Sequence, residues 1–152
     1  MAGLLHDVGK LILNRLFSDF FSHTLDFIHQ KSLFSIQVED EVLSVNHAHV
    51  GGYLAVSWNL PDAVTEAIVC HHNPSTARTF PKIASVMYIA NSICSSLAHG
   101  NSGEVRRRSS DDPALNRLLL KLGVGPNVLE KFTSMAEEQL ERADLYEVAL
   151  YC

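Results

Sequence analysis

The sequence lacks the features that mark a membrane or nucleic-acid-binding protein. No apolar run approaches the roughly 20 residues that cross a bilayer, and His, Asp and Lys interrupt the first ten residues, where a signal peptide needs an apolar core. The formal charge is -5, whereas a nucleic-acid footprint is normally basic. We therefore expect neither a membrane nor a nucleic-acid partner.

Cysteine is scarce and shows no pairing pattern. The three cysteines, Cys70, Cys94 and Cys152, are odd in number and form no CxxC motif, which favours a reducing, cytoplasmic location. Cys70 directly precedes His71, so a thiolate ligand is one reading and a small buried apolar residue is another. The second is favoured, because a single unpaired cysteine has no motif support.

Period-two alternation is absent, so we expect an all-α domain, a compact bundle of about seven or eight helices. A chain of 152 residues fits one domain. The paired Gly51 and Gly52 indicate close approach of another backbone or of a ligand. The short basic run Arg106–Arg108 is predicted to belong to a solvated loop. The apolar spacing predicts helices over residues 3–16, 17–30, 36–58, 61–72, 83–97, 113–122 and 126–148, with loops at 75–79 and 100–103 and a break at Gly123 and Gly125.

An adjacent His6-Asp7 pair lies in the first apolar helical pattern. Imidazole and carboxylate together suit a divalent transition metal. Lys10 lies one helical turn beyond His6, on the same predicted face, where its positive charge could meet a phosphate oxygen.

Three further histidines have positions that suit the same centre, namely His47, His71 and His72. Helical bundles build metal sites from inward side chains on different helices. Adjacent His71 and His72 diverge by about 100° on a regular helix, but both can face one centre if the helix ends there, as Asn73-Pro74 indicates.

The remaining histidines are assigned to surfaces or helix ends. His49 lies two positions from His47, so the two cannot share a helix face. His23, His29 and His99 have no polar cluster around them. Taken singly, a His or Asp on a helix is most often a satisfied or exposed polar group; the joint occurrence favours a metal site.

The chain resembles the HDOD branch of the HD superfamily of metal-dependent phosphohydrolases. The resemblance spans nearly the whole chain. Its motifs are Ala2-Gly3-Leu4-Leu5-His6-Asp7-Val8-Gly9-Lys10-Leu11, then residues 47–55, Trp58-Asn59-Leu60-Pro61, Glu66-Ala67-Ile68 and His71-His72-Asn73-Pro74.

The resemblance implies an all-helical fold and a set of site residues. His6 and Asp7 would bind metal, with Asp7 bridging in two-metal relatives and Lys10 contacting phosphate. A second metal would be held by His47, His71 and His72. The cofactor would be Fe, Mn, Ni, Zn or Mg.

The sequence also departs from active relatives in three places. The family's upstream helix with a further His does not precede His6, so we expect a single domain over 1–152 that is truncated at its N-terminus. Asn91 stands where active relatives carry a metal-binding Asp. Residues 73–81 lack the Gly-Tyr-Pro element of the cyclic-dinucleotide phosphodiesterase branch.

These departures favour a signalling or regulatory domain with a partly degenerate metal site. The pocket of such a domain would bind a nucleotide or other phosphoester, a metal, or nothing, and the domain would pass a conformational signal to a signalling protein partner. The alternatives are an active metal-dependent phosphohydrolase, with Asp7 and Lys10 in catalytic roles, and a helical oligomerisation scaffold. A homodimer would use the amphipathic surface at Phe132 and Leu140.

Overall fold

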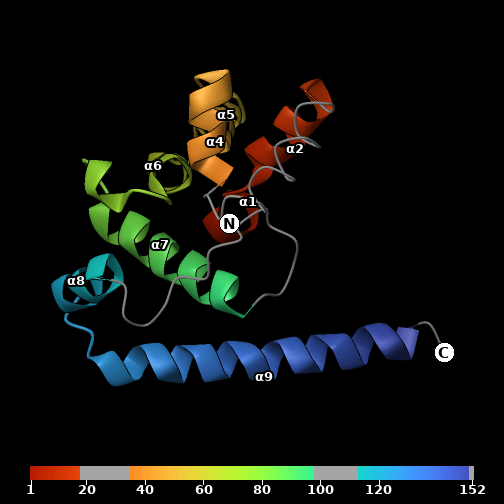
Figure 1. Cartoon of the computed structure of the whole chain (residues 1–152), viewed down its shortest axis with the longest axis vertical. Coiled ribbons are helices and arrows are strands. Elements are labelled where there is room, and N and C mark those ends of the chain that lie inside the picture. The colour runs from red at the N-terminus through yellow and green to blue at the C-terminus, as the bar shows by residue number, and fades with distance from the viewer. Residues whose placement is uncertain (18–34, 98–112, 151–152) are drawn as a thin grey trace. The chain divides into compact units, whose positions relative to one another are not determined.

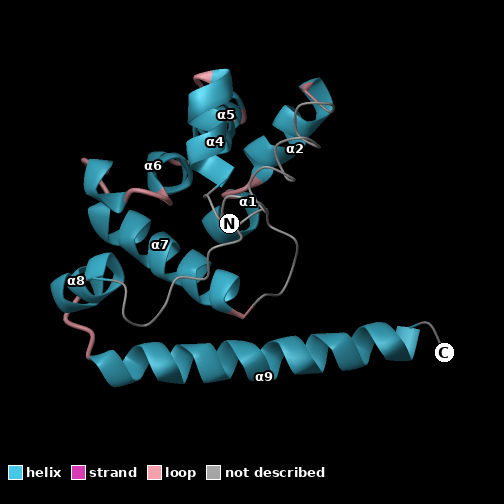
Figure 2. Cartoon of the chain, viewed as in Figure 1, coloured by secondary structure: helices cyan, strands magenta, loops and turns pink. Residues whose placement is uncertain are grey.

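The computed structural model describes residues 1–17, 35–97 and 113–150. All regular structure in these ranges is helical, and no strand occurs among them (Figure 2), so the expected all-α fold is confirmed. Several predictions lie outside the described residues: most of the helix over 17–30, the turn at 100–103, the Arg106–Arg108 loop, and His23, His29 and His99.

The chain divides into two compact units. The described residues up to Asn91 belong to the first unit, and those from Ser92 onward belong to the second. The single domain expected over 1–152 stays a prediction. Each unit is described below by itself.

In the first unit, helix α5 contacts three other helices. It packs against α2, α4 and α6, while α1 packs against α6 (Figure 1). The buried side chains at these contacts are mostly apolar, among them Leu13, Ala48, Ala67 and Ile68. The elements are α1 (Ala2–Leu5), α2 (Val8–Leu16), α4 (Ser35–Leu43), α5 (His47–Ser57), α6 (Asp62–Cys70), the 3₁₀ turn η1 (Pro74–Thr76) and α7 (Pro81–Ser96), which continues into the second unit.

Glycines set the close approach of α2 to α5. A Cβ on Gly9 would overlap the backbone carbonyl of His47, and one on Gly51 would lie 2.9 Å from the Ile68 side chain and 3.7 Å from the Gly9 nitrogen. A Cβ on Gly52 would overlap Val69. The paired glycines were predicted to mark close approach of another backbone or of a ligand; the backbone approach is confirmed at Gly51, where α2 and α5 meet backbone to backbone, whereas Gly52 faces a side chain.

Two of the predicted helices are each broken into two. The helix expected over 3–16 is interrupted at His6-Asp7, and Asp7 adopts φ -100° and ψ 7° as the residue before α2. The helix expected over 36–58 is interrupted between Leu43 and His47, where Ser44 has φ +55°. Asn46 then caps α5, its side chain accepting a hydrogen bond from the His49 N–H at 3.0 Å.

In the second unit, α8 (Pro113–Lys121) and α9 (Pro126–Leu150) agree with the predicted helices. Gly123 between them has φ +71°, a conformation that favours glycine. Leu115, Leu119 and Leu129 are buried. None of the helices described has the length and apolar character needed to span a membrane.

Candidate metal centre

The interruption at His6-Asp7 places the Asp7 carboxylate among the histidines of other helices. On a continuous helix, adjacent side chains point about 100° apart, but here α1 ends before His6 and α2 begins after Asp7. The Lys10 ammonium donates to Asp7 Oδ2 at 2.8 Å. Lys10, in the first turn of α2, therefore reaches back to the residue that precedes the helix, and it approaches the same carboxylate oxygen as His6.

His47 is the first residue of α5 and is fully buried. Its Nδ1 lies 2.6 Å from Glu39 Oε2, and its backbone N–H donates to the same oxygen at 2.7 Å. A carboxylate only accepts, so Nδ1 carries the proton and the Nε2 lone pair is left to face Asp7.

His71 follows the last residue of α6 and is also fully buried. Its Nδ1 lies 2.6 Å from the carbonyl oxygen of Ile68. A carbonyl accepts and cannot donate, so Nδ1 carries a proton and Nε2 is the ring atom that faces the centre. His72 comes next in the chain, after α6 has ended, and its Nε2 lies 2.9 Å from His47 Nε2.

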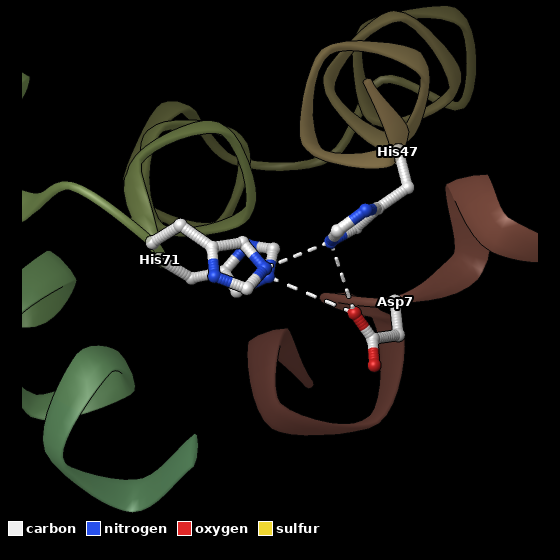
Figure 3. A group of neighbouring side chains, drawn as sticks. Asp7, His47 and His71 are labelled. Carbon is white, nitrogen blue, oxygen red and sulfur yellow. Dashed lines mark hydrogen bonds and ion pairs between the residues drawn. The ribbon is translucent and has the colours of Figure 1, made fainter. Parts of the chain in front are cut away.

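Asp7, His47, His71 and His72 thus form one group. One ligand atom from each residue lies within 4.8 Å of the others. Asp7 Oδ1 is 3.4 Å from His47 Nε2 and 3.7 Å from His71 Nε2 (Figure 3). The prediction that His71 and His72 face a shared centre at a helix end is confirmed.

The two sides of the Asp7 carboxylate differ in their surroundings. Oδ1 faces the buried histidines, while Oδ2 lies near Lys10 and 3.6 Å from His6 Nε2. The His6 Nδ1 lies 2.8 Å from the Gly3 carbonyl, so the His6 Nε2 lone pair also points at the carboxylate. His6 lies beside the four-residue group and is not one of its members.

The electrostatics favour an ionised Asp7 and neutral imidazole at His47. Burial raises the pKa of the Asp7 carboxyl, but His71, Lys10 and further neighbours outweigh this effect and hold the pKa well below its ordinary value. Burial lowers the pKa of His47, against the opposing effect of Glu39. Ionised carboxylate and neutral imidazole are the forms that bind metals.

The group meets two requirements of a divalent metal site. Three of its ligand separations are 2.9, 3.4 and 3.7 Å, close to the roughly 3.0–3.5 Å expected when ligand atoms lie about 2.0–2.2 Å from one ion, and all lie within 4.8 Å. In addition, Asp7 Oδ1 and His71 Nε2 are buried atoms that lack a hydrogen-bond partner in the part of the chain described. Buried polar atoms of this kind are rare unless they have an unseen partner, such as an ion. Three imidazoles and one carboxylate suit Zn, Fe, Mn or Ni.

The other sequence candidates lie outside this group. His49 is exposed and lines a separate groove of about 480 Å³ between α5 and α6. Cys70 is buried, with its sulfur 3.4 Å from the Thr76 hydroxyl, and is not a member of the group. Asn91, which the sequence predicted to be a degenerate ligand position, lies on α7 and is partly exposed.

Glu39 is the buried residue of this site that sequence reasoning missed. On one continuous helix, residues 39 and 47 would lie about 12 Å apart along the axis, so no contact was expected. The break after Leu43 brings them together. The available signal was Asn46, a favoured residue immediately before the start of a helix.

Comparison with known proteins agrees with this fold. Residues 1–74 match the family model of the HDOD domain, and this part of the chain belongs to the HDOD domain family. These residues contain His6, Asp7, Lys10, Glu39, His47, His71 and His72.

Two individual proteins are similar to the chain. A protein of Treponema pallidum (strain Nichols), described as uncharacterized, is 29% identical over 93 residues, which are 60% of this chain and 18% of the relative. The crystal structure of an HDOD domain protein with unknown function from Geobacter sulfurreducens matches with a TM-score of 0.74 at 22% identity. That match covers 93% of this chain and 51% of the solved one, so the likeness establishes the fold alone.

Proposed function

We propose that this chain is a regulatory HDOD domain whose Asp7, His47, His71 and His72 bind a divalent transition metal. The observation that supports the metal site is the convergence of imidazole nitrogens and a carboxylate oxygen. Asp7 Oδ1 lies within 3.7 Å of the Nε2 atoms of both His47 and His71, and the Nδ1 hydrogen bonds of both rings leave those Nε2 atoms as acceptors when the rings are neutral. Lone pairs directed at one another repel unless a proton or a metal cation lies between them.

The regulatory role rests on the sequence resemblance and on the residue at position 91, which lies outside the four-residue group. Asn91 offers a neutral amide oxygen where active relatives place a carboxylate, and a change of this kind weakens metal binding or activity at least as much as the 10–100-fold typical of outer-shell changes. In this proposal the site binds a metal and a phosphoester or nucleotide ligand, and the domain transmits the bound state to a signalling partner.

Metal titration of the purified chain tests the site. Stripped protein is titrated with Zn²⁺, Mn²⁺, Ni²⁺ and Co²⁺, and bound metal is counted by elemental analysis. We expect Asp7→Asn and His47→Gln to weaken binding by at least 10–100-fold, because each removes a direct ligand.

His49→Gln is the matched control, because His49 lies on the same helix as His47 but is exposed. Far-UV circular dichroism establishes that each variant folds. Undetectable binding by the unsubstituted chain, or equal loss in His49→Gln and His47→Gln, would contradict the proposed site.

A second candidate, metal-dependent phosphoester hydrolysis, is favoured by the position of Lys10. Its ammonium lies 2.8 Å from Asp7 Oδ2, so positive charge is available beside the centre for a phosphate oxygen. A bound metal would supply Lewis acidity and lower the pKa of a bound water. Metal-stimulated release of p-nitrophenol from bis(p-nitrophenyl) phosphate, abolished by Asp7→Asn, would establish hydrolysis and displace the purely regulatory proposal.

A further inference from the structure

Glu39 is a buried carboxylate that accepts two hydrogen bonds from one residue of the site. Its side chain is 1% exposed, and a single oxygen, Oε2, accepts from both the backbone N–H and the ring Nδ1–H of His47. Burying an ionised carboxylate carries a large desolvation cost unless donors or opposite charge offset it. The position of Glu39 therefore calls for a role that a neutral residue could not fill.

The two hydrogen bonds fix His47 in both position and tautomer. The backbone bond holds the first residue of α5, and the ring bond orients the imidazole and places its proton on Nδ1. The opposite nitrogen, Nε2, then faces Asp7 Oδ1 at 3.4 Å. The ring thus lies between two carboxylates. Glu39 accepts a hydrogen bond from Nδ1–H, and Asp7 lies beside Nε2.

Glu39 also differs from the groups that orient the neighbouring rings. The Nδ1 atoms of His71 and His6 face the backbone carbonyls of Ile68 and Gly3, which are neutral. At His47 the acceptor is a carboxylate. A carboxylate that accepts the second N–H of a ligating imidazole raises its basicity as a ligand and orients it.

We infer that Glu39 is a positioning residue for the metal site, which acts through His47 and does not itself bind the metal. This inference rests on the proposed function. With both carboxyl groups ionised, Asp7 and Glu39 carry two negative charges against the one positive charge of Lys10, which leaves a net negative charge for a divalent cation. The α4–α5 break, which brings Glu39 to His47, is then part of the architecture of the site.

The first test reads the His47 ring directly and needs no metal. In ¹⁵N-labelled, metal-free protein at pH 7.5, long-range ¹H–¹⁵N correlation spectra distinguish the protonated nitrogen of each imidazole. We expect His47 to be neutral with its proton on Nδ1, and we expect Glu39→Gln to shift the ring toward the Nε2-protonated form. A His47 ring protonated on Nε2, or on both nitrogens, in the unsubstituted protein would overturn the inference.

The second test measures Zn²⁺ and Co²⁺ affinity. Glu39→Gln keeps the shape and an acceptor oxygen but removes the charge, and we expect binding 10–100-fold weaker. Glu41→Gln is the matched control, because Glu41 lies on the same helix and is exposed. Affinity of Glu39→Gln within twofold of the unsubstituted chain would overturn this inference alone, whereas no binding by the unsubstituted chain would overturn the proposed function and this inference with it.

Discussion

At the residue scale, Glu66 fixes the connection that follows the two site histidines. Its carboxylate accepts from the backbone N–H groups of Arg78 at 2.8 Å and Thr79 at 3.0 Å, and also from that of Phe80. These three consecutive N–H groups lie just before α7 begins at Pro81. A side chain on α6 therefore satisfies donors that would otherwise depend on water.

The hydrogen bonds from Thr79 and Arg78, with that from Phe80, lower the pKa of Glu66 in the folded state. Because its folded-state pKa is lowered, Glu66 stabilises the fold at pH values above about 4.5, the pKa of the group in the unfolded chain. This contribution is lost as the pH falls through the folded-state pKa. We expect Glu66→Gln to lower the urea unfolding midpoint at pH 7, with the difference from the unsubstituted chain shrinking toward pH 3.

The control for this prediction is Glu130→Gln, which removes a negative charge from an exposed position on α9. It is expected to leave the unfolding midpoint nearly unchanged at both pH values. A Glu66→Gln difference that stays constant from pH 7 to pH 3 would show that the ionised carboxylate is not the stabilising species.

At the element scale, the close approach of α2 and α5 depends on Gly9. A Cβ at this position would overlap the His47 carbonyl, which is backbone and cannot rotate away. Gly9→Ala must therefore separate the two helices, and we expect a loss of about 1–3 kcal/mol of unfolding free energy, as is usual for overpacking. Chemical denaturation measures this loss.

Gly3→Ala is the matched substitution, because Gly3 is also helical but has nothing within 4 Å of the added Cβ. There the gain in helix propensity of up to about 1 kcal/mol is unopposed, so Gly3→Ala is expected to be neutral or stabilising. Equal stability of the two variants would contradict the proposed closeness of α2 and α5.

The sequence predicted where the helices lie better than where they are interrupted. Apolar spacing identified α6, α7, α8 and α9, and Pro61 and Gly123 marked two of the boundaries. The break at His6-Asp7 was missed because neither residue excludes helical geometry. The break after Leu43 was missed because Ser44 adopts positive φ, which serine rarely does.

The candidate site was predicted only in part, again because the ends of the helices were not predicted. Asp7, His47, His71 and His72 were named from their residue types and the family resemblance, and the structure brings them together. Glu39 and the pairing of Lys10 with Asp7 depend on where helices begin and end, and apolar periodicity does not determine those ends to within a residue.

At the scale of the whole molecule, the first unit contains both the candidate site and the single tryptophan, Trp58. Trp58 follows the last residue of α5, whose first residue is His47. Tryptophan fluorescence therefore reports unfolding of the unit in which metal would bind, separately from the helices of the second unit.

A ligand that binds only the folded state stabilises it by about 2.7 kcal/mol at a concentration of 100 Kd. We expect saturating Zn²⁺ to raise the Trp58 thermal transition by several degrees and a chelator to reverse the shift. Asp7→Asn should abolish the shift, since it removes a ligand. A shift of equal size in Asp7→Asn would show that the metal stabilises the chain from another site.

The backbone contact between α2 and α5 has a consequence for how this chain can change in evolution. The α2–α5 spacing is set where Gly9 meets the carbonyl of His47, and side-chain volume has little part in it. Exchanges of apolar residues elsewhere in the core can therefore accumulate while Asp7 and His47 keep their distance. Tolerance of sequence drift is then least at a glycine that has no chemical role of its own.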